Sequence, residues 1–395
     1  MSRRCSSTPG GEGVHSPDLS RVPAQGSPPA QAPARAQAQA QAQAGGDGAL
    51  AVGDGAAVAV TVALTAYLHA RAGEFLRGLR LYGDSGADTA AATEAARSLR
   101  MTARRIGGTL HTFRPLLDPV WADGLRTELS WLSGTLAQEH ASTARLNRLL
   151  DALARLSGTA TGAGAGTGTV PGTGAAPDIG AAGGGPGRGA LTVGAARAAA
   201  LLERRLTLAR TRAHSATLQA LGSARCHAVA DAVAVLTSEL PPAPAAGALP
   251  LPDGADAAAE RRLLDAVAAL PLARAGHPYN AEALLNGLAT ASAEELQDEP
   301  WHRVRTLLRL HRYALEVLGP ERNPVLDRAG QVLDRHRDAS EAAAAAAAAA
   351  RTPRIAPATA YALGVLHADQ RHEVEAARFA FQEIWQGSIA VQAAL

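Results

Sequence analysis

The 395-residue sequence predicts an all-α fold, on the basis of three observations. Apolar residues recur three and four positions apart along most of the chain, which is the period of an amphipathic helix. No run shows the alternating β-branched residues that are typical of a strand. Alanine supplies much of the 47% of hydrophobic residues and favours helix, whereas aromatic residues make up only 3%. We therefore expect helices that pack without a sheet.

Low-complexity segments divide the chain into a tail and two helical halves. Residues 1–57 are rich in Pro, Gly, Ser, Gln and Ala and lack apolar side chains to offset the entropy of ordering, so we expect a disordered tail. Residues 157–189 consist mainly of Gly, Thr and Ala and predict a flexible linker. The first helical half then spans residues 58–156 and the second spans residues 190–388.

The predicted helices follow the apolar periodicity, and prolines close several of the periodic runs. The helices are expected at residues 58–82, 89–114, 120–156, 190–238, 256–272, 279–290, 292–318, 322–350 and 357–388, with closing prolines at Pro115, Pro241, Pro242 and Pro320. The alanine run after Glu341 extends its helix through propensity alone. We assign no chemistry to that run.

The composition indicates the cellular compartment of the protein and the way in which it could form an anion-binding site. The chain has 38 basic and 36 acidic side chains, a formal net charge of +2, and no lysine, so every basic side chain among the 38 is an arginine. An anion site must therefore come from local clustering of guanidinium groups, each of which binds an oxyanion at two points.

Two cysteines, Cys5 and Cys226, cannot form a disulfide framework. With no apolar run long enough for a membrane span and no secretory signal, we expect a cytoplasmic protein.

Two polar stripes share one spacing, about 205 residues apart. Each keeps offsets of 0, 3, 7, 10 and 14, which place side chains on one face of a helix. The first stripe is Arg97, Arg100, Arg104, Gly107 and His111, and the second is His302, Arg305, Arg309, Arg312 and Glu316. Apolar residues also match, with Leu99, Ala103, Ile106, Leu110 and Phe113 corresponding to Val304, Leu308, His311, Leu315 and Leu318. This pattern indicates an internal duplication.

Like charges at such spacings repel each other, so the stripes do not stabilise their own helices. A single stripe is explained by a solvated helix face. Two stripes at equivalent positions favour a shared groove in which guanidinium groups follow a linear polyanion. The alternative is a helical scaffold with a degenerate anion site that binds a protein partner.

Several segments resemble the CHAD domains, the conserved-histidine α-helical domains. SLRMTARRIGGTLHTFRPLL with LSWLSGTL is similar to their first signature, and WHRVRTLLRLHRYALEVLGP with GQVLDRHRDA to their second. LQALGSARCHAV, with Ser223 and Arg225, resembles a Ser-x-Arg segment, and FAFQEIWQ resembles the closing helix. The resemblance covers residues 58–388. It implies two pseudo-symmetric four-helix bundles around a basic central groove, binding of inorganic polyphosphate, and a location at polyphosphate granules.

The resemblance also implies site residues. The expected polyphosphate-binding residues are Arg97, Arg100, Arg104, Arg105, Arg225, His302, Arg305, Arg309 and Arg312, with Tyr313, His336 and Asp338 in support. Several positions depart from the family pattern. Arg97 replaces a histidine, Gly107 and His111 replace arginines, His140 and Ala141 replace an Arg–Asp pair, and Thr306 and Leu310 replace a basic pair. We therefore expect weaker polyphosphate binding than in a member with all these residues.

Other functions have less support in the sequence. There is no P-loop and no nucleophile motif, and a fused triphosphate tunnel enzyme would need a lysine in its ExExK motif, so we expect no enzyme activity and no cofactor. Phosphohydrolase activity ranks last. No HxxxH or HExxH pair occurs, so we expect no metal site. Trp131 and Trp385 have Leu or Ile as a neighbour in the sequence, which is typical of core anchors, so we do not expect nucleic-acid binding.

Overall fold

The computed structural model describes residues 32–86, 88–158, 186–242, 254–276, 291–319 and 323–394. The chain separates into two compact units, residues 1–58 and residues 59–395, and the site lies in the second. Within the described ranges the secondary structure is helical, apart from an isolated bridge between Leu117 and Pro242. The predicted all-α class is confirmed.

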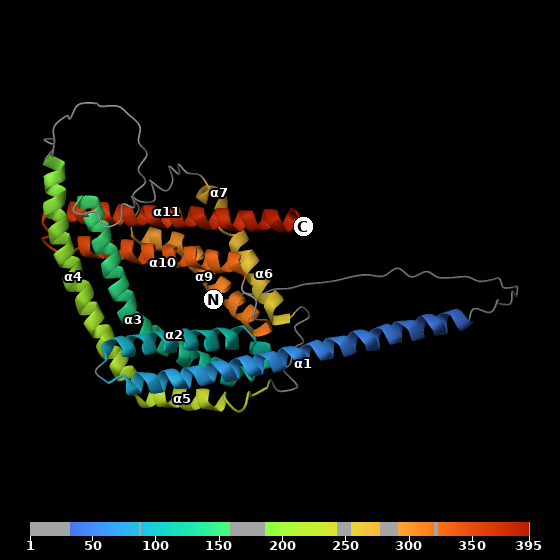
Figure 1. Ribbon diagram of the computed structural model, residues 1–395. Helices are drawn as coiled ribbons and strands as arrows, with labels where there is room; N and C mark the ends of the chain where they lie inside the picture. Colours follow the sequence, from blue (N-terminus) through green and yellow to red (C-terminus); the bar gives the residue numbers. More distant parts are fainter. Residues whose placement is uncertain are drawn as a thin grey trace, which may run out of the picture. The chain divides into compact units, whose positions relative to one another are not determined.

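The helix boundaries lie close to those predicted from the periodicity (Figure 1). In chain order the elements are α1 (Ala32–Asp84), α2 (Thr89–Thr112), the 3-10 turn η1 (Arg114–Leu116), α3 (Pro119–Ser157), α4 (Pro186–Leu221), α5 (Ala224–Val235), α6 (Gly254–Ala268), α7 (Leu272–Ala275), α9 (Ala291–Leu318), α10 (Pro324–Ala350) and α11 (Pro357–Ala394). The helix expected at 279–290 lies outside the described residues, as do Pro320 and most of the expected linker.

Two boundaries differ from the prediction. The helix α1 begins at Ala32 instead of residue 58, because Ala and Gln both have high helix propensity. The single helix expected at 190–238 is two helices, so that prediction was wrong. Ser223 caps α5 by accepting a hydrogen bond from the backbone N–H of Cys226 at 3.1 Å, and Gly222 before it weakens helix continuation.

Three clusters of buried apolar side chains hold the second unit together. The first joins α1, α2, α5 and the N-terminal half of α3, together with Ala255 of α6 and Ala314 and Val317 of α9. The second joins α6, α9, the N-terminal half of α10 and the C-terminal half of α11. The third joins the remaining halves of α3, α10 and α11 with α4. Five helices, α3, α6, α9, α10 and α11, each contribute to two clusters, and the two pseudo-symmetric bundles remain a prediction.

The predicted apolar stripe of α2 is fully buried, from Leu99 to Phe113. On α9 the stripe ends earlier, because Leu318, the last residue of the helix, is exposed. His311 of this stripe is buried, its Nδ1 lacks a hydrogen-bond partner among the described residues, and burial lowers its pKa. Cys226 is also buried, which raises the pKa of its thiol.

The alanine run contributes packing as well as helix propensity. Ala342, Ala346 and Ala349 are buried against α3, α4 and α11. Their small side chains allow α10 and α11 to lie side by side along much of their length (Figure 1). Among the helices that the structure describes, none has the length and hydrophobicity that a membrane span requires.

Candidate functional site

The two stripe-bearing helices, α2 and α9, approach each other where Gly108 meets Tyr313. A Cβ atom on Gly108 would lie 2.5 Å from Cδ2 of Tyr313 and 3.3 Å from Cδ2 of Leu310. Any larger residue would force a shift, so this approach depends on glycine. Gly108 lies eleven positions after Arg97, and Tyr313 lies eleven after His302. The duplicated segments therefore touch at equivalent positions.

Five arginines from three helices gather beside this contact, and we call them the arginine cluster: Arg100 and Arg104 of α2, Arg305 and Arg309 of α9, and Arg337 of α10. Burial and the charges of Arg104 and Arg337 lower the pKa of Arg100. Burial and the charges of Arg104 and Arg305 lower the pKa of Arg309 to about 10. The guanidinium groups are thus close enough to repel one another.

Part of the cluster lacks hydrogen-bond partners. The Nε of Arg100 and the Nη2 of Arg309 are buried without a partner among the described residues. Asp334 accepts a hydrogen bond from Nε of Arg305 at 2.5 Å, and Asp338 accepts one from Nε of Arg337 at 3.0 Å. Because a buried unpaired donor costs about 1–3 kcal/mol, the cluster opposes folding and favours an added anion.

The sequence stripes did not reveal Arg337, although it lies in the GQVLDRHRDA segment between His336 and Asp338. Arg145 of α3 was also missed, and its Nη2 donates to Oε2 of Glu341 at 2.6 Å. Nε of Arg337 lies 3.5 Å from Oε1 of the same carboxylate. No spacing rule connects α3 or α10 to the stripes, so only the packing of the helices reveals these two residues.

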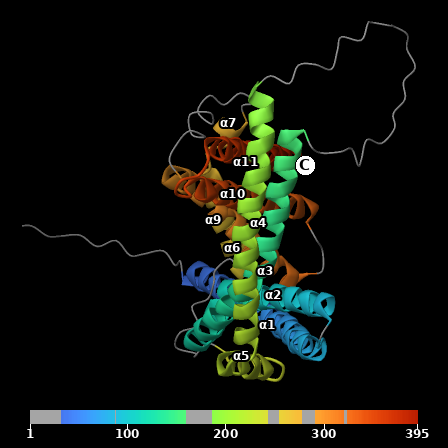
Figure 2. The ribbon, with the colours of Figure 1, turned by 90° about the vertical axis from the view of Figure 1, so that its left-hand side faces the viewer.

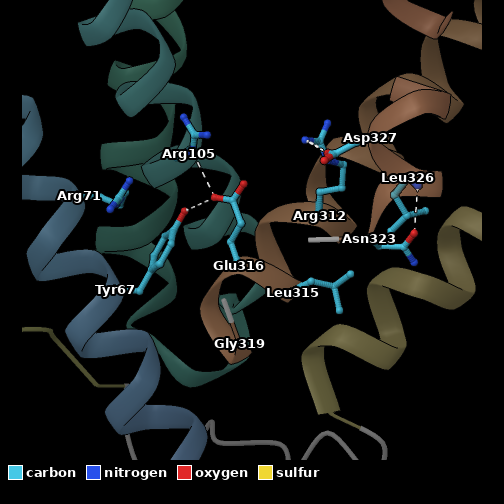
Figure 3. Close-up of a pocket in the computed structure, with 10 residues that line it drawn as sticks. All are labelled: Tyr67, Arg71, Arg105, Arg312, Leu315, Glu316, Gly319, Asn323, Leu326 and Asp327. Atoms are coloured by element: carbon cyan, nitrogen blue, oxygen red, sulfur yellow. Dashed lines mark hydrogen bonds and ion pairs between the residues drawn. The ribbon is translucent and has the colours of Figure 1, made fainter. Parts of the chain in front are cut away.

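Arg105 and Arg312 lie in a different place, a cavity of about 290 Å³ that we call the Glu316 pocket (Figure 3). Nε of Arg105 donates to Oε2 of Glu316 at 3.1 Å, and the Tyr67 hydroxyl donates to the same oxygen at 3.0 Å. Arg312 forms an ion pair with Asp327. Burial and Glu316 raise the pKa of Tyr67, so its hydroxyl remains a donor. Carboxylates offset the positive charge of Arg105 and Arg312.

Tyr313 lies between the arginine cluster and the Glu316 pocket. The guanidinium carbon of Arg105 is 6.0 Å from the centroid of its ring. Arg104 and Arg309 of the arginine cluster also lie near Tyr313. The ring packs on Gly108, and the supporting role expected for Tyr313 remains a prediction.

Two of the expected binding residues have partners outside the cluster. Arg97 is 58% exposed in its side chain and lies 3.4 Å from Glu94, although its charge still lowers the pKa of Arg100. Arg225 of α5 donates to Glu128 of α3 at 2.6 Å, and its guanidinium carbon lies 4.0 Å from the ring centroid of Trp131. The structure therefore places Arg97 at the edge of the cluster and gives Arg225 partners on α3.

His302 and His336 lie together at the N-terminal part of α9, with ring centroids 5.5 Å apart. His336 is buried and stacks on Trp301 with a centroid distance of 5.6 Å. Its Nε2 accepts a hydrogen bond from Nε of Arg378 at 3.2 Å. Burial and the charge of Arg378 lower the pKa of His336 to about 2, and burial also lowers the pKa of His302. Both rings are neutral at pH 7 and support the fold around the cluster.

Asp298 connects this histidine pair to α11, a connection that the stripes did not predict. Its carboxylate accepts hydrogen bonds from Nη1 of Arg371 at 2.7 Å and from Nη2 of Arg378 at 2.6 Å. All three side chains are buried. A buried carboxylate with two guanidinium partners holds α11 against α9, because removing any partner would leave an unpaired buried charge.

Arg126 of α3 lies beside two positions where the family pattern has arginine. A Cβ atom on Gly107 would lie 3.9 Å from Cγ of Arg126, and Nδ1 of His111 lies 2.6 Å from Nη1 of Arg126. Burial and the Arg126 charge lower the pKa of His111. Among the described residues, no three His, Cys, Asp or Glu side chains form a group that could hold a metal ion.

Comparisons with known proteins agree with this architecture. The family model of the CHAD domain matches residues 70–344. A solved structure, PptA from Streptomyces chartreusis, is 56% identical, with a TM-score of 0.64 over 82% of this chain and 98% of that chain. A search of curated proteins finds no match. The family match covers more than half of the chain and includes both stripe-bearing helices, so the chain belongs to the CHAD-domain family.

Proposed function

We propose that this protein binds inorganic polyphosphate, or a similar linear polyanion, through the arginine cluster without cleaving it. One observation carries the proposal: five guanidinium groups are held together, and two of their N–H donors, on Arg100 and Arg309, are buried without partners among the described residues. Membership of a family linked to polyphosphate supports the choice of ligand. A phosphate chain supplies the acceptors and the negative charge that the cluster lacks.

Binding is electrostatic in this proposal. Arg309 remains charged at pH 7, because even a pKa of about 10 is far above that pH. Each guanidinium–phosphate contact releases condensed counterions, so five contacts give a log–log salt slope of about 3.5, by analogy with single-stranded nucleic acid. Affinity should then fall about 100-fold between 50 and 200 mM salt.

Calorimetric titration with long-chain polyphosphate across a salt series tests the proposal. The variant Arg100→Gln/Arg309→Gln removes the two unpaired donors and should bind at least about tenfold more weakly at 0.1 M salt, with a salt slope reduced by about 1.4. The matched control is Arg114→Gln/Arg155→Gln, which also removes two charges but from exposed ion pairs with Asp123 and Asp369. It should bind within about threefold of the wild type.

Three results would contradict the proposal. The first is no binding by the wild type at low salt. The second is an equal loss of affinity in the control variant, which would indicate a response to total charge. The third is release of orthophosphate from polyphosphate with added divalent metal. A stoichiometric protein partner that polyphosphate does not displace would instead favour the scaffold alternative.

The proposal extends to location in the cell. We propose that the protein is cytoplasmic and gathers at polyphosphate granules through the arginine cluster. A fluorescent fusion should co-localise with stained granules, and the Arg100→Gln/Arg309→Gln variant should be diffuse. If the fusion stays on granules despite both substitutions, its location does not depend on the arginine cluster, and this part of the proposal is wrong.

A further inference from the structure

The helix α4 presents a long exposed face outside the arginine cluster. One side of α4 packs on α3 and α11, where Ala198, Leu202 and Leu206 are buried (Figure 2). The opposite side carries Arg197, Arg204 and Arg212, all exposed, and we call these three residues the α4 basic face. Their offsets of 0, 7 and 15 place them on one side of the helix over about 22 Å.

Charge is concentrated on this helix. Residues Pro186–Leu221 contain six arginines and one glutamate, a formal charge of +5 in a chain whose formal net charge is +2. Arg205 has a structural role, since its guanidinium donates to the carbonyl oxygen of Ala348 at 2.9 Å and to Oγ1 of Thr352 at 2.8 Å, at the C-terminus of α10. The three arginines of the α4 basic face have no ion pair among the described residues.

The fold gives no reason for these three unpaired charges. Some exposed arginines elsewhere have carboxylate partners, for example Arg114 with Asp123 and Arg225 with Glu128, whereas none of the three on this face has one among the described residues. The face also differs from a membrane-binding helix, which needs a continuous apolar stripe. Its exposed apolar residues are isolated, at Val193, Leu208 and Leu218. A row of guanidinium groups without carboxylates complements an extended polyanion.

We propose that the α4 basic face binds a second segment of the polyphosphate chain whose first segment occupies the arginine cluster. This inference rests on the proposed function. The cluster lies on α2, α9 and α10, whereas α4 packs mainly on α3 and α11, so only a long chain reaches both. Once the first segment is bound, the rest of the polyphosphate chain is held at high effective concentration near the protein. Contacts with the three arginines of the α4 basic face then increase the affinity for polyphosphate. The α4 basic face therefore makes binding depend on chain length.

The test compares tripolyphosphate with long-chain polyphosphate. The variant Arg197→Gln/Arg204→Gln/Arg212→Gln should bind tripolyphosphate like the wild type and long chains about tenfold more weakly, with a salt slope lower by about 2. The control Arg77→Gln/Arg80→Gln/Arg328→Gln removes three exposed arginines of α1 and α10. It should keep the wild-type affinity for both ligands. Circular dichroism confirms that both variants fold.

The outcomes separate the two proposals. If the α4 variant and the wild type bind long-chain polyphosphate with equal affinity, the proposed binding of a second segment at the α4 basic face is wrong. The proposed binding at the arginine cluster is then unaffected. Absence of tripolyphosphate and long-chain binding in the wild type overturns both. If the α4 variant loses affinity for single-stranded DNA of equal charge but keeps its affinity for long polyphosphate, the face serves nucleic acid, and the inference is overturned.

Discussion

Gly108 and Tyr313 occupy equivalent positions in the two halves of the chain and contact each other where α2 meets α9. This contact sets the separation of the two helices that carry four of the five arginines of the cluster. The cluster therefore depends on a residue with no side chain, and a change at Gly108 should affect stability and ligand binding together.

Gly108→Ala tests this dependence. The added methyl would lie 2.5 Å from the Tyr313 ring, so we expect a loss of about 1–3 kcal/mol in the free energy of unfolding and weaker polyphosphate binding. Urea denaturation and calorimetry measure the two effects. The neighbouring variant Gly107→Ala is the control, because its methyl would meet atoms only at 3.9 Å and should stabilise the helix. Equal effects at both positions would contradict the argument.

Arg309 should lower the free energy of unfolding while it contributes to polyphosphate binding. Its folded-state pKa of about 10 lies below the ordinary arginine value, so its charge opposes folding at every pH below about 10. Arg309→Met should raise the free energy of unfolding by about 1–3 kcal/mol and lower polyphosphate affinity severalfold. Urea denaturation at pH 7 checks the first effect. A destabilised Arg309→Met variant would show that Arg309 has partners that compensate its charge.

Asp334 partly neutralises the cluster through its hydrogen bond to Arg305. Asp334→Asn removes that negative charge and should tighten polyphosphate binding severalfold, with a steeper salt dependence. The comparison is Asp327→Asn, which removes a carboxylate from the Glu316 pocket instead. If Asp327→Asn tightens binding more than Asp334→Asn, the ligand lies in the pocket and the cluster assignment is wrong.

His336 should make the fold sensitive to acid. Its pKa is about 2 when folded and near 6.5 when unfolded, so only the unfolded chain takes up the proton as pH falls below 6.5. The free energy of unfolding should then fall by about 1.4 kcal/mol per pH unit from this residue. Urea titrations from pH 7.5 to 4.5 measure the slope. His336→Gln should reduce it, and an unchanged slope would mean that His336 is protonated in the fold.

The sequence predicted the helices well where periodicity and caps coincide. Apolar residues at Leu99, Ala103 and Ile106 repeat with the helical period, so both the helix and its buried face could be read without a structure. The break at Gly222 was missed, because the apolar period continues across it. The Ser223 side chain caps the start of α5, and this local hydrogen bond competes with continuation of α4.

The site was only partly predictable. Arg100, Arg104, Arg305 and Arg309 share a spacing, and that spacing identified them. Arg105 and Arg312 belong to the same motifs, but both line the Glu316 pocket. Arg105 points about 100° further round α2 than Arg104, whereas Arg312 shares the face of Arg309 but lies about one turn further along α9. Arg337 and Arg145 enter from helices that carry no stripe.

The sequence by itself predicted the all-α class, most helix boundaries and the repeated stripe, and it shows the absence of lysine, because these depend on residue type and on spacing within one helix. Tertiary structure alone decided which arginines meet, which have carboxylate partners, and that Asp298 joins α9 to α11. The physical reason is that charge compensation depends on distances between side chains far apart in the chain. Those distances are set by close approaches such as that of Gly108 to Tyr313.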